Sequence, residues 1–332
     1  MNYEKTVSVI IPVLNEEKNI INLVEALCEQ DYPKELTEFI FVDGGSKDRS
    51  KDLIHEQCKK KGLNYLVIDN PNRTAPYAFN LGFENSTGEI IVILNAHSVY
   101  HKDYISNGVR HLITSDAVNV GGYVTTVGRG NIGKSIAAIL SSRFGVGKSE
   151  FRISKETKYV DTVPFGTFYR SLIDEIGGFN VELPRSEDNE FNHRITEHGG
   201  KILMVSDMEI TYFCRETVKE LLKMGFSNGT GVGYTAIKYP KVMKPKYFVP
   251  LLFMLSIVTM PIMAINTKSQ AIKNVFSLEL LVYLALDLYY TSVANVDFKT
   301  KLPMPVLFPA FHISYGAGTV KGILKGIQSK RD

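Results

Sequence analysis

Short polar segments follow apolar runs at four places along this chain, and this repeated order constrains the fold more than any other feature. The segments are Pro12-Val13-Leu14-Asn15-Glu16, Val42-Asp43-Gly44-Gly45-Ser46, Asn95-Ala96-His97 and Ser186-Glu187-Asp188. In open α/β sheets, ligands bind in the crevice at the carboxyl ends of the strands. Polar side chains that follow several successive strands can therefore converge on a single pocket.

The N-terminal part of the sequence alternates between strand and helix patterns. Val7 to Val13 is a nearly continuous apolar run, typical of a strand buried on both faces. Asn15 offers an N-cap for a helix whose apolar stripe consists of Ile20, Leu23, Val24 and Leu27. Ser46 is predicted to cap a second helix, and further strands are predicted at residues 38–42, 63–68 and 89–94. This alternation predicts an α/β fold with a parallel sheet.

The apolar residues are unevenly distributed along the 332 residues. Tyr247 to Ile265 is a run without charge, long enough to span a bilayer core of about 30 Å. Ile272 to Ala294 is similar but includes charged residues, and Leu302 to Val320 is uncharged but interrupted by prolines. We therefore expect a helical membrane region in the last third of the chain.

Clustered lysines constrain the orientation of this region. Lys238, Lys241, Lys244 and Lys246 precede the first run, as expected of a cytoplasmic segment beside anionic lipid. Basic residues near the C-terminus favour the same side, which requires an even number of crossings. Two crossings satisfy this if Leu302 to Val320, with a turn at Gly316-Ala317-Gly318, lies in the interface or re-enters. Three crossings are the alternative.

A domain boundary is predicted near Pro240 to Pro245, where prolines and lysines separate residues 1–240 from a membrane-associated helical region of residues 241–332. A second segment, Gly130 to Arg152, carries apolar residues on one face. Such a segment either lies on the membrane surface or packs against the sheet as core.

Composition and termini narrow the class of protein. The formal net charge of +3 is too small and too localised to suggest a nucleic acid partner. The N-terminal apolar run is short and leads directly into Asn15-Glu16-Glu17, so no signal peptide is expected and the catalytic part should stay in the cytoplasm. Cys28, Cys58 and Cys214 have no metal-ligand spacing and are interpreted as free thiols.

Three segments resemble the signature segments of glycosyltransferase family 2, inverting enzymes with a GT-A fold. They are residues 7–16, residues 42–48 and Ser186-Glu187-Asp188, and the likeness covers roughly residues 5 to 240. More narrowly, Val160-Asp161-Thr162-Val163-Pro164-Phe165-Gly166 and His312-Ile313-Ser314-Tyr315-Gly316 are similar to segments of the succinoglycan-type glucosyltransferases of bacterial exopolysaccharide assembly. Those enzymes also end in membrane segments.

The resemblance implies a Rossmann-like GT-A domain followed by a helical membrane region. Such an enzyme moves a hexose from a nucleotide diphosphate sugar, which we expect to be UDP-linked. The implied acceptor is a polyprenyl-linked glycan, used in surface or exopolysaccharide synthesis. The implied location is the cell membrane, with the catalytic domain in the cytoplasm.

Residue chemistry and the resemblance together suggest a donor site, and each residue also has a simpler interpretation. Asp43 can accept hydrogen bonds from a uracil N–H or ribose hydroxyls, or it can only form the turn before Gly44. Glu16 would lie beside the nucleoside, or only compensate a helix N-terminus. Arg73 could bind ribose or phosphate oxygens, or lie solvated in a loop. The expected donor-binding set is Pro12, Asn15, Glu16, Asp43, Gly45, Arg73 and Asn95.

Asn95-Ala96-His97 occupies the position where the family usually has Asp-x-Asp, a motif that binds ribose and the Mg²⁺ or Mn²⁺ on the diphosphate. Imidazole is an acceptable ligand for Mn²⁺ and a poorer one for Mg²⁺, so His97 is the expected metal ligand. The narrower family has His here but Asp at the position of Asn95. Metal dependence and full activity are therefore open.

The resemblance assigns the catalytic acids. An inverting transferase needs one carboxylate to take the proton of the attacking hydroxyl. Asp188 matches the family's base. Glu187 matches the neighbouring acid, which the resemblance assigns to positioning the acceptor or the loop. The pair precedes a helical pattern with Phe191 and Ile195 one turn apart, so both acids should stand at a helix N-terminus, where the dipole favours ionised carboxylates. A simple helix cap is the other interpretation.

Two other functions compete with this one. A nucleotide-sugar-binding protein with weak or no transferase activity is favoured by the missing carboxylates at residues 95–97 and opposed by the intact Glu187-Asp188. A dinucleotide-dependent oxidoreductase is opposed by the lack of Gly-x-Gly-x-x-Gly after the first strand.

Overall fold

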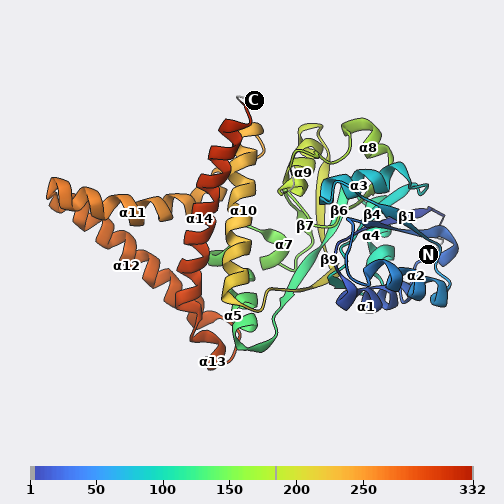
Figure 1. Ribbon diagram of the computed structural model, residues 1–332, viewed down its shortest axis with the longest axis horizontal. Helices are drawn as coiled ribbons and strands as arrows, with labels where there is room; N and C mark the ends of the chain where they lie inside the picture. The colour runs from blue at the N-terminus through green and yellow to red at the C-terminus, as the bar shows by residue number, and fades with distance from the viewer. Residues whose placement is uncertain (1–3, 184, 331–332) are drawn as a thin grey trace. The chain divides into compact units, whose positions relative to one another are not determined.

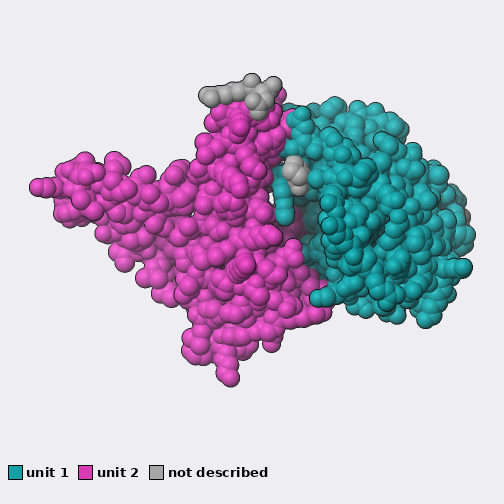
Figure 2. All heavy atoms as spheres, viewed as in Figure 1, with its two compact units in different colours: residues 1–125, 154–212 teal, residues 126–153, 213–332 magenta. Residues whose placement is uncertain are grey.

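The structure, a computed structural model, describes residues 4–183 and 185–330. The chain forms two compact units (Figure 2). The first comprises residues 1–125 and 154–212, and the second comprises residues 126–153 and 213–332. Neither unit is therefore one continuous stretch of sequence.

The first unit is built on a mixed β-sheet. Its strands run from edge to edge in the order β3-β2-β1-β4-β8-β6-β9-β5, with β7 paired to β9. Their bounds are β1 (Val7–Val13), β2 (Thr37–Asp43), β3 (Tyr65–Asp69), β4 (Ile90–Ile93), β5 (Ser98–Tyr100), β6 (Ala117–Val127), β7 (Lys158–Tyr159), β8 (Thr167–Tyr169) and β9 (Lys201–Phe213). β1 is parallel to both β2 and β4, whereas β8 is antiparallel to β4. The loops after β1, β2 and β4 therefore leave the same edge of the sheet.

Helices alternate with these strands (Figure 1). They are α1 (Glu17–Cys28), η1 (Lys34–Leu36), α2 (Ser50–Lys61), α3 (Ala75–Glu84), α4 (Tyr104–Thr114), α8 (Ser171–Ile176) and α9 (Glu187–Glu197). The predicted first strand has the predicted bounds, and the apolar stripe of α1 is buried. The α/β prediction is confirmed.

Two capping predictions are wrong. Asn15 precedes the N-cap position of α1 and has a left-handed backbone (φ 56°), and its Oδ1 accepts a hydrogen bond from the N–H of Lys47 at 2.9 Å. Ser46 lies before α2, which begins at Ser50, and its hydroxyl donates to Asp43. Both side chains connect loops to each other, so neither is available to a helix terminus.

The second unit is helical. Its helices are α5 (Gly130–Leu140), α6 (Arg143–Val146), α7 (Glu150–Ile153), α10 (Val218–Lys238), η2 (Pro245–Phe248), α11 (Val249–Thr267), α12 (Gln270–Val293), α13 (Phe298–Lys301) and α14 (Met304–Gln328). α10 and α14 lie side by side, and α11 and α12 form a hairpin that projects from them (Figure 1). α5 and α6 contact α12, α13 and α14. The α5 and α6 parts of the predicted segment 130–152 therefore pack on the helices of the second unit.

Glycines let α10 and α14 touch backbone to backbone. A Cβ atom added to Gly229 would lie 1.9 Å from the carbonyl oxygen of Tyr315, and one added to Gly318 would lie 2.0 Å from that of Phe226. Cβ atoms added to Gly322 and Gly233 would lie 2.1 and 2.2 Å from carbonyl oxygens of the opposite helix. The turn predicted at Gly316-Ala317-Gly318 is wrong, because these residues continue α14 and Gly318 serves this contact.

The α11–α12 hairpin exposes apolar side chains. Among the described helices, one segment, Pro245–Thr267, is long and apolar enough to cross a membrane by length and composition. Its side chains at Leu252 and Ile265 are 64% and 73% exposed. α12 also exposes many apolar side chains but carries the charged residues noted in the sequence.

Candidate active site

The loops after β1 and β2 are joined at the carboxyl edge of the sheet. Ser46 Oγ accepts a hydrogen bond from the N–H of Asn15 at 2.8 Å, and Asn15 Oδ1 accepts one from Lys47. Pro12 lies near the end of β1, opposite Val42 of β2. The polar segments after the two strands therefore form one continuous rim.

Asp43 ends β2 and builds the turn that follows it. This residue is 2% exposed. Its carboxylate accepts hydrogen bonds from the N–H groups of Gly45 and Ser46 at 3.1 and 3.0 Å and from the Ser46 hydroxyl at 2.5 Å. Gly45 has φ 77°, a backbone conformation that favours glycine. The turn thus uses most of the acceptor capacity of this carboxylate.

Arg73 reaches the same turn from the loop after β3. Its own backbone is left-handed, with φ 64°. Its Nε donates to the carbonyl oxygen of Gly44 at 3.1 Å, and its Nη2 donates to that of Gly45 at 3.3 Å. The guanidinium therefore lies at the Asp43 turn, as a donor-site residue would, but it also holds the turn together.

Glu16 and His97 bring together the loops after β1 and β4. Glu16 Oε1 lies 3.1 Å from His97 Nδ1, and Glu16 Oε2 accepts a hydrogen bond from Asn19 Nδ2 at 2.6 Å. The Glu16 side chain is 18% exposed and that of His97 is 43% exposed. One side of this pair therefore faces solvent.

Asn95 is held within its own loop. Its Oδ1 accepts a hydrogen bond from the N–H of His97 at 3.1 Å, and its N–H donates to the hydroxyl of Tyr100 at 2.7 Å. The ring of Tyr212 in β9 lies edge-on to His97, with 6.1 Å between ring centroids. Sequence reasoning missed both tyrosines. Tyr100 lies only five residues from Asn95, whereas Tyr212 reaches the site through the pairing of β9 with β5.

Few side chains at this site could bind a metal ion. Within residues 4–183 and 185–330, no group of three or more His, Cys, Asp or Glu side chains could hold one. Glu16 and His97 do place a carboxylate oxygen beside an imidazole nitrogen, and both atom types are suitable ligands for Mn²⁺. The pair fits a divalent ion whose remaining ligands come from a diphosphate and water.

Glu187 and Asp188 form a second group, in the first turn of α9. Both side chains are half-buried. Burial, and then the charge of Asp188, raise the pKa of Glu187 to about 7. Asp188 Oδ1 accepts a hydrogen bond from the N–H of Asn189 at 2.8 Å. The charge of Asp188 and the burial of Glu187 both disfavour ionisation of Glu187, so the pair tends to retain one proton.

The sequence profile of glycosyl transferase family 2 matches residues 8–177, just over half of the 332 residues. This stretch includes the loops after β1, β2 and β4. The chain belongs to glycosyl transferase family 2. The predicted family is confirmed, and this family 2 chain is a glycosyltransferase. The oxidoreductase alternative is thereby excluded.

Two curated relatives cover most of this family 2 chain. A dolichyl N-acetyl-alpha-D-glucosaminyl phosphate 3-beta-D-2,3-diacetamido-2,3-dideoxy-beta-D-glucuronosyltransferase of Methanococcus voltae is 28% identical over 331 residues, 96% of this chain and 98% of the relative. The succinoglycan biosynthesis protein ExoA of Rhizobium meliloti is 24% identical and covers 73% of this chain and 74% of its own length.

Solved structures show the same fold. The mannosyltransferase PcManGT from Pyrobaculum calidifontis, in complex with GDP-Man and Mn²⁺, has a TM-score of 0.61 at 18% identity, covering 99% of this chain and 89% of its own. TarS of S. aureus, residues 1–349 in complex with UDP-GlcNAc, has a TM-score of 0.52 at 16% identity, covering 96% and 91%. The GT-A fold prediction is confirmed.

Proposed function

We propose that this family 2 chain is an inverting hexosyltransferase that uses a nucleotide diphosphate sugar as donor and a polyprenyl-linked glycan as acceptor. The observation that carries the donor half is the convergence of four loops at one sheet edge. Arg73, after β3, contacts the Asp43 turn after β2, and Glu16, after β1, contacts His97, after β4. Such an edge is where α/β folds bind nucleotides. A UDP-linked sugar is the proposed donor.

The acceptor half is supported by a relative and by the second unit. The Methanococcus voltae relative is named for transfer to a dolichyl-linked sugar phosphate. The α11–α12 hairpin exposes apolar side chains that a bilayer would cover. We therefore propose that residues 241–332 form the membrane-associated region and residues 1–240 the transferase domain, on the cytoplasmic side of the cell membrane.

Asp188 is the proposed general base. The acceptor hydroxyl oxygen would attack the anomeric carbon while the bond from that carbon to the diphosphate oxygen breaks. The hydroxyl proton would pass to the Asp188 carboxylate, and the nucleoside diphosphate would leave with the bonding electrons. Glu187, with its raised pKa, would place a neutral carboxyl beside the base and limit repulsion with the phosphates.

A divalent cation, Mn²⁺ or Mg²⁺, would neutralise the diphosphate when bound, with Glu16 and His97 as its protein ligands. The remaining donor-site roles are proposed for Pro12, Asn15 and Gly45, which shape the rim, and for Asn95, which fixes the backbone of His97. A nucleotide-sugar-binding protein with weak activity is the second candidate, because Asn95 Oδ1 is already engaged by that backbone N–H.

A donor screen tests the proposal. Full-length protein in detergent would be incubated with radiolabelled nucleotide sugars and a lipid extract, alongside Asp188→Asn and the control Asp116→Asn, a surface acid paired with Lys201. We expect lipid-soluble product from the wild type and from Asp116→Asn. Asp188→Asn should lose about three decades of turnover, as expected for removal of a general base. Product at about a tenth of the wild-type rate in Asp188→Asn would assign the base elsewhere.

A further inference from the structure

Arg194, in the last turn of α9, binds the turn that follows α8. Its Nη2 donates to the carbonyl oxygen of Gly178 at 2.6 Å, and its Nη1 donates to that of Gly177 at 3.1 Å and to that of Ile176. Carbonyl groups at the end of a helix lack partners within the helix. A planar guanidinium can bind several of them at once, which a lysine ammonium cannot do in the same geometry.

Glu190 holds this guanidinium in place. Arg194 Nε donates to Glu190 Oε1 at 2.7 Å, and Arg194 Nη2 donates to Glu190 Oε2 at 3.0 Å. Glu190 is 5% exposed, so this bidentate pair lies largely out of solvent. Pairs of this kind are geometrically specific, and removing one partner leaves an uncompensated charge.

The turn that Arg194 binds is itself fixed. Asn80 of α3 exchanges two hydrogen bonds with the backbone of Phe179, both at 2.8 Å. The Phe179 ring stacks on Phe191 of α9, with centroids 4.4 Å apart and planes inclined by 15°. On another side of α9, Asn192 accepts a hydrogen bond from Asn119 at 2.8 Å and donates to the Thr162 hydroxyl at 2.9 Å. Arg194 and Phe191 are therefore the contacts that attach α9 to the turn after α8.

The N-cap of α9 is formed without a side-chain hydrogen bond. Ser186 occupies the N-cap position with φ 67° and its side chain makes no capping hydrogen bond. A side-chain cap ordinarily satisfies the first N–H groups of a helix. The contacts of Glu190, Phe191 and Arg194 lie one to two turns farther along the same helix, so they contribute to where Glu187 and Asp188 lie.

We propose that Arg194 and Glu190 are a positioning pair for transfer: they hold α9 on the turn after α8 so that the carboxylate of Asp188 meets the acceptor hydroxyl. This inference rests on the proposed role of Asp188 as base. The pair acts on the rate of the chemical step and leaves donor affinity unchanged.

The main test is a double-mutant cycle in the full-length protein. Arg194→Gln should lower kcat by about 10-fold to 100-fold, the scale of a small misplacement of a catalytic group, with the donor KM within about threefold. In the Asp188→Asn background, Arg194→Gln should lower the residual rate by less than about twofold, because a residue that acts through Asp188 has nothing left to position. Glu190→Gln should repeat both results.

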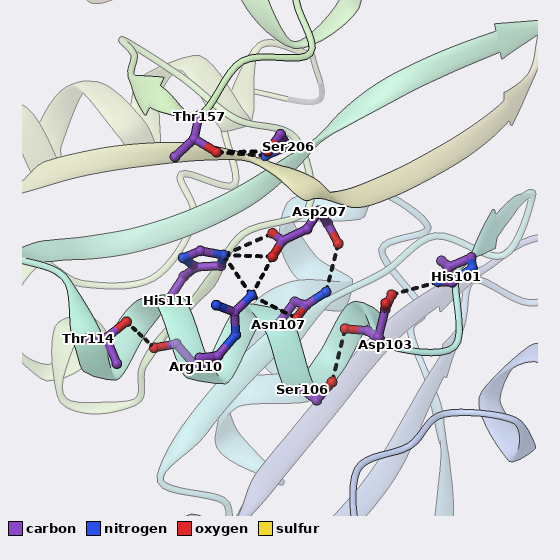
Figure 3. Close-up of polar contacts among 10 residues, drawn as sticks. All are labelled: His101, Asp103, Ser106, Asn107, Arg110, His111, Thr114, Thr157, Ser206 and Asp207. Carbon is purple, nitrogen blue, oxygen red and sulfur yellow. Dashed lines mark hydrogen bonds and ion pairs between the residues drawn. The ribbon is translucent and has the colours of Figure 1, made fainter. Parts of the chain in front are cut away.

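Arg110→Gln is the matched control. Arg110 of α4 pairs with Asp207 of β9 and also donates to Asn107, in a cluster that includes His111 (Figure 3). Its loss should lower the melting temperature while leaving kcat unchanged. If Arg194→Gln is too unstable to assay, Arg194→Lys keeps the charge without the fork and should show a smaller kcat loss at a near-native melting temperature.

The outcomes separate this inference from the proposed function. An inactive Asp188→Asn together with wild-type kcat in Arg194→Gln would overturn the positioning pair alone. So would an equal loss from Arg194→Gln in both backgrounds, because that residue would then act independently of Asp188. An active Asp188→Asn would instead overturn the base assignment.

Discussion

The Glu16 carboxylate and the His97 imidazole lie 3.1 Å apart although 81 residues separate them in the sequence. The contact joins two segments that each looked incomplete as a metal or nucleotide site. Two protein ligands, Glu16 and His97, are too few to hold a divalent ion tightly without the phosphate oxygens of a donor.

Metal binding should therefore depend on the donor. Mn²⁺ should bind the wild-type protein weakly alone and appreciably with UDP, and should support transfer better than Mg²⁺ because of the imidazole. His97→Ala should raise the Mn²⁺ concentration for half-maximal activity about tenfold, within the range for loss of a ligand or its partner. His55→Ala, a change on α2, is the control. Equal rates in chelator would show that Arg73 or other cations neutralise the diphosphate.

Asp43 should contribute to nucleoside affinity beyond its role in the turn. Calorimetric titration with UDP should show about tenfold weaker binding for Asp43→Ala, the scale of one lost hydrogen bond to a charged group. The same factor should apply to the whole sugar nucleotide. Ser46→Ala removes the hydroxyl that donates to Asp43 but keeps the carboxylate, and should weaken UDP binding less than threefold. Equal losses in both variants would confine Asp43 to a structural role.

The raised pKa of Glu187 predicts a pH-dependent stability. Because its folded pKa is about 7 and its ordinary value is 4.5, the neutral carboxyl is favoured in the folded protein. Its contribution to stability is full below about pH 4.5 and is lost as pH rises through about 7. Glu187→Gln, which stays neutral, should gain a few degrees in melting temperature relative to wild type between pH 5 and 8. Glu175→Gln, at an exposed acid of α8, should show no such trend.

The glycine contact between α10 and α14 predicts an unusual response to alanine. Gly→Ala in a helix interior ordinarily stabilises by about 1 kcal/mol. Gly229→Ala should destabilise instead, because the new Cβ would lie 1.9 Å from the carbonyl oxygen of Tyr315. Gly133→Ala in α5, whose Cβ would meet its nearest neighbour at 3.4 Å, is the control. Thermal unfolding in detergent would compare them, and a more stable Gly229→Ala would contradict the close approach.

Local patterns predicted the strands and helices of the sheet well, because burial on both faces leaves a continuous apolar run such as Val7–Val13. The uses of individual polar side chains were harder to predict. Asn15 and Ser46 are both residue types that commonly cap helices. The structure shows instead that their two loops pack together, with Asn15 bonded to Lys47 and Ser46 bonded to Asn15. The same limit hid Tyr212, which reaches His97 across paired strands.

The order of short motifs identified the two site acids. The residues that hold their helix in place could not be identified in the same way. Glu187 and Asp188 stand at the start of a helix as the sequence indicated. The role of Arg194 could not be predicted, because its partners, the carbonyls after α8, carry no signature in the sequence. Likewise, the glycines of α14 suggest a turn until α10 is known to lie beside them.

The second unit is built from two separate stretches of the sequence, and this affects how the protein folds during synthesis. Residues 126–153 belong to the second unit, but their partners in α12 to α14 come well over a hundred residues later. At ribosomal speeds of about 5 to 20 residues per second, α5 and α6 would wait roughly ten to thirty seconds for these partners. During that time the apolar face of α5 would be uncovered on the nascent chain. Early contact of this segment with the membrane surface or a chaperone would protect it until α14 is made.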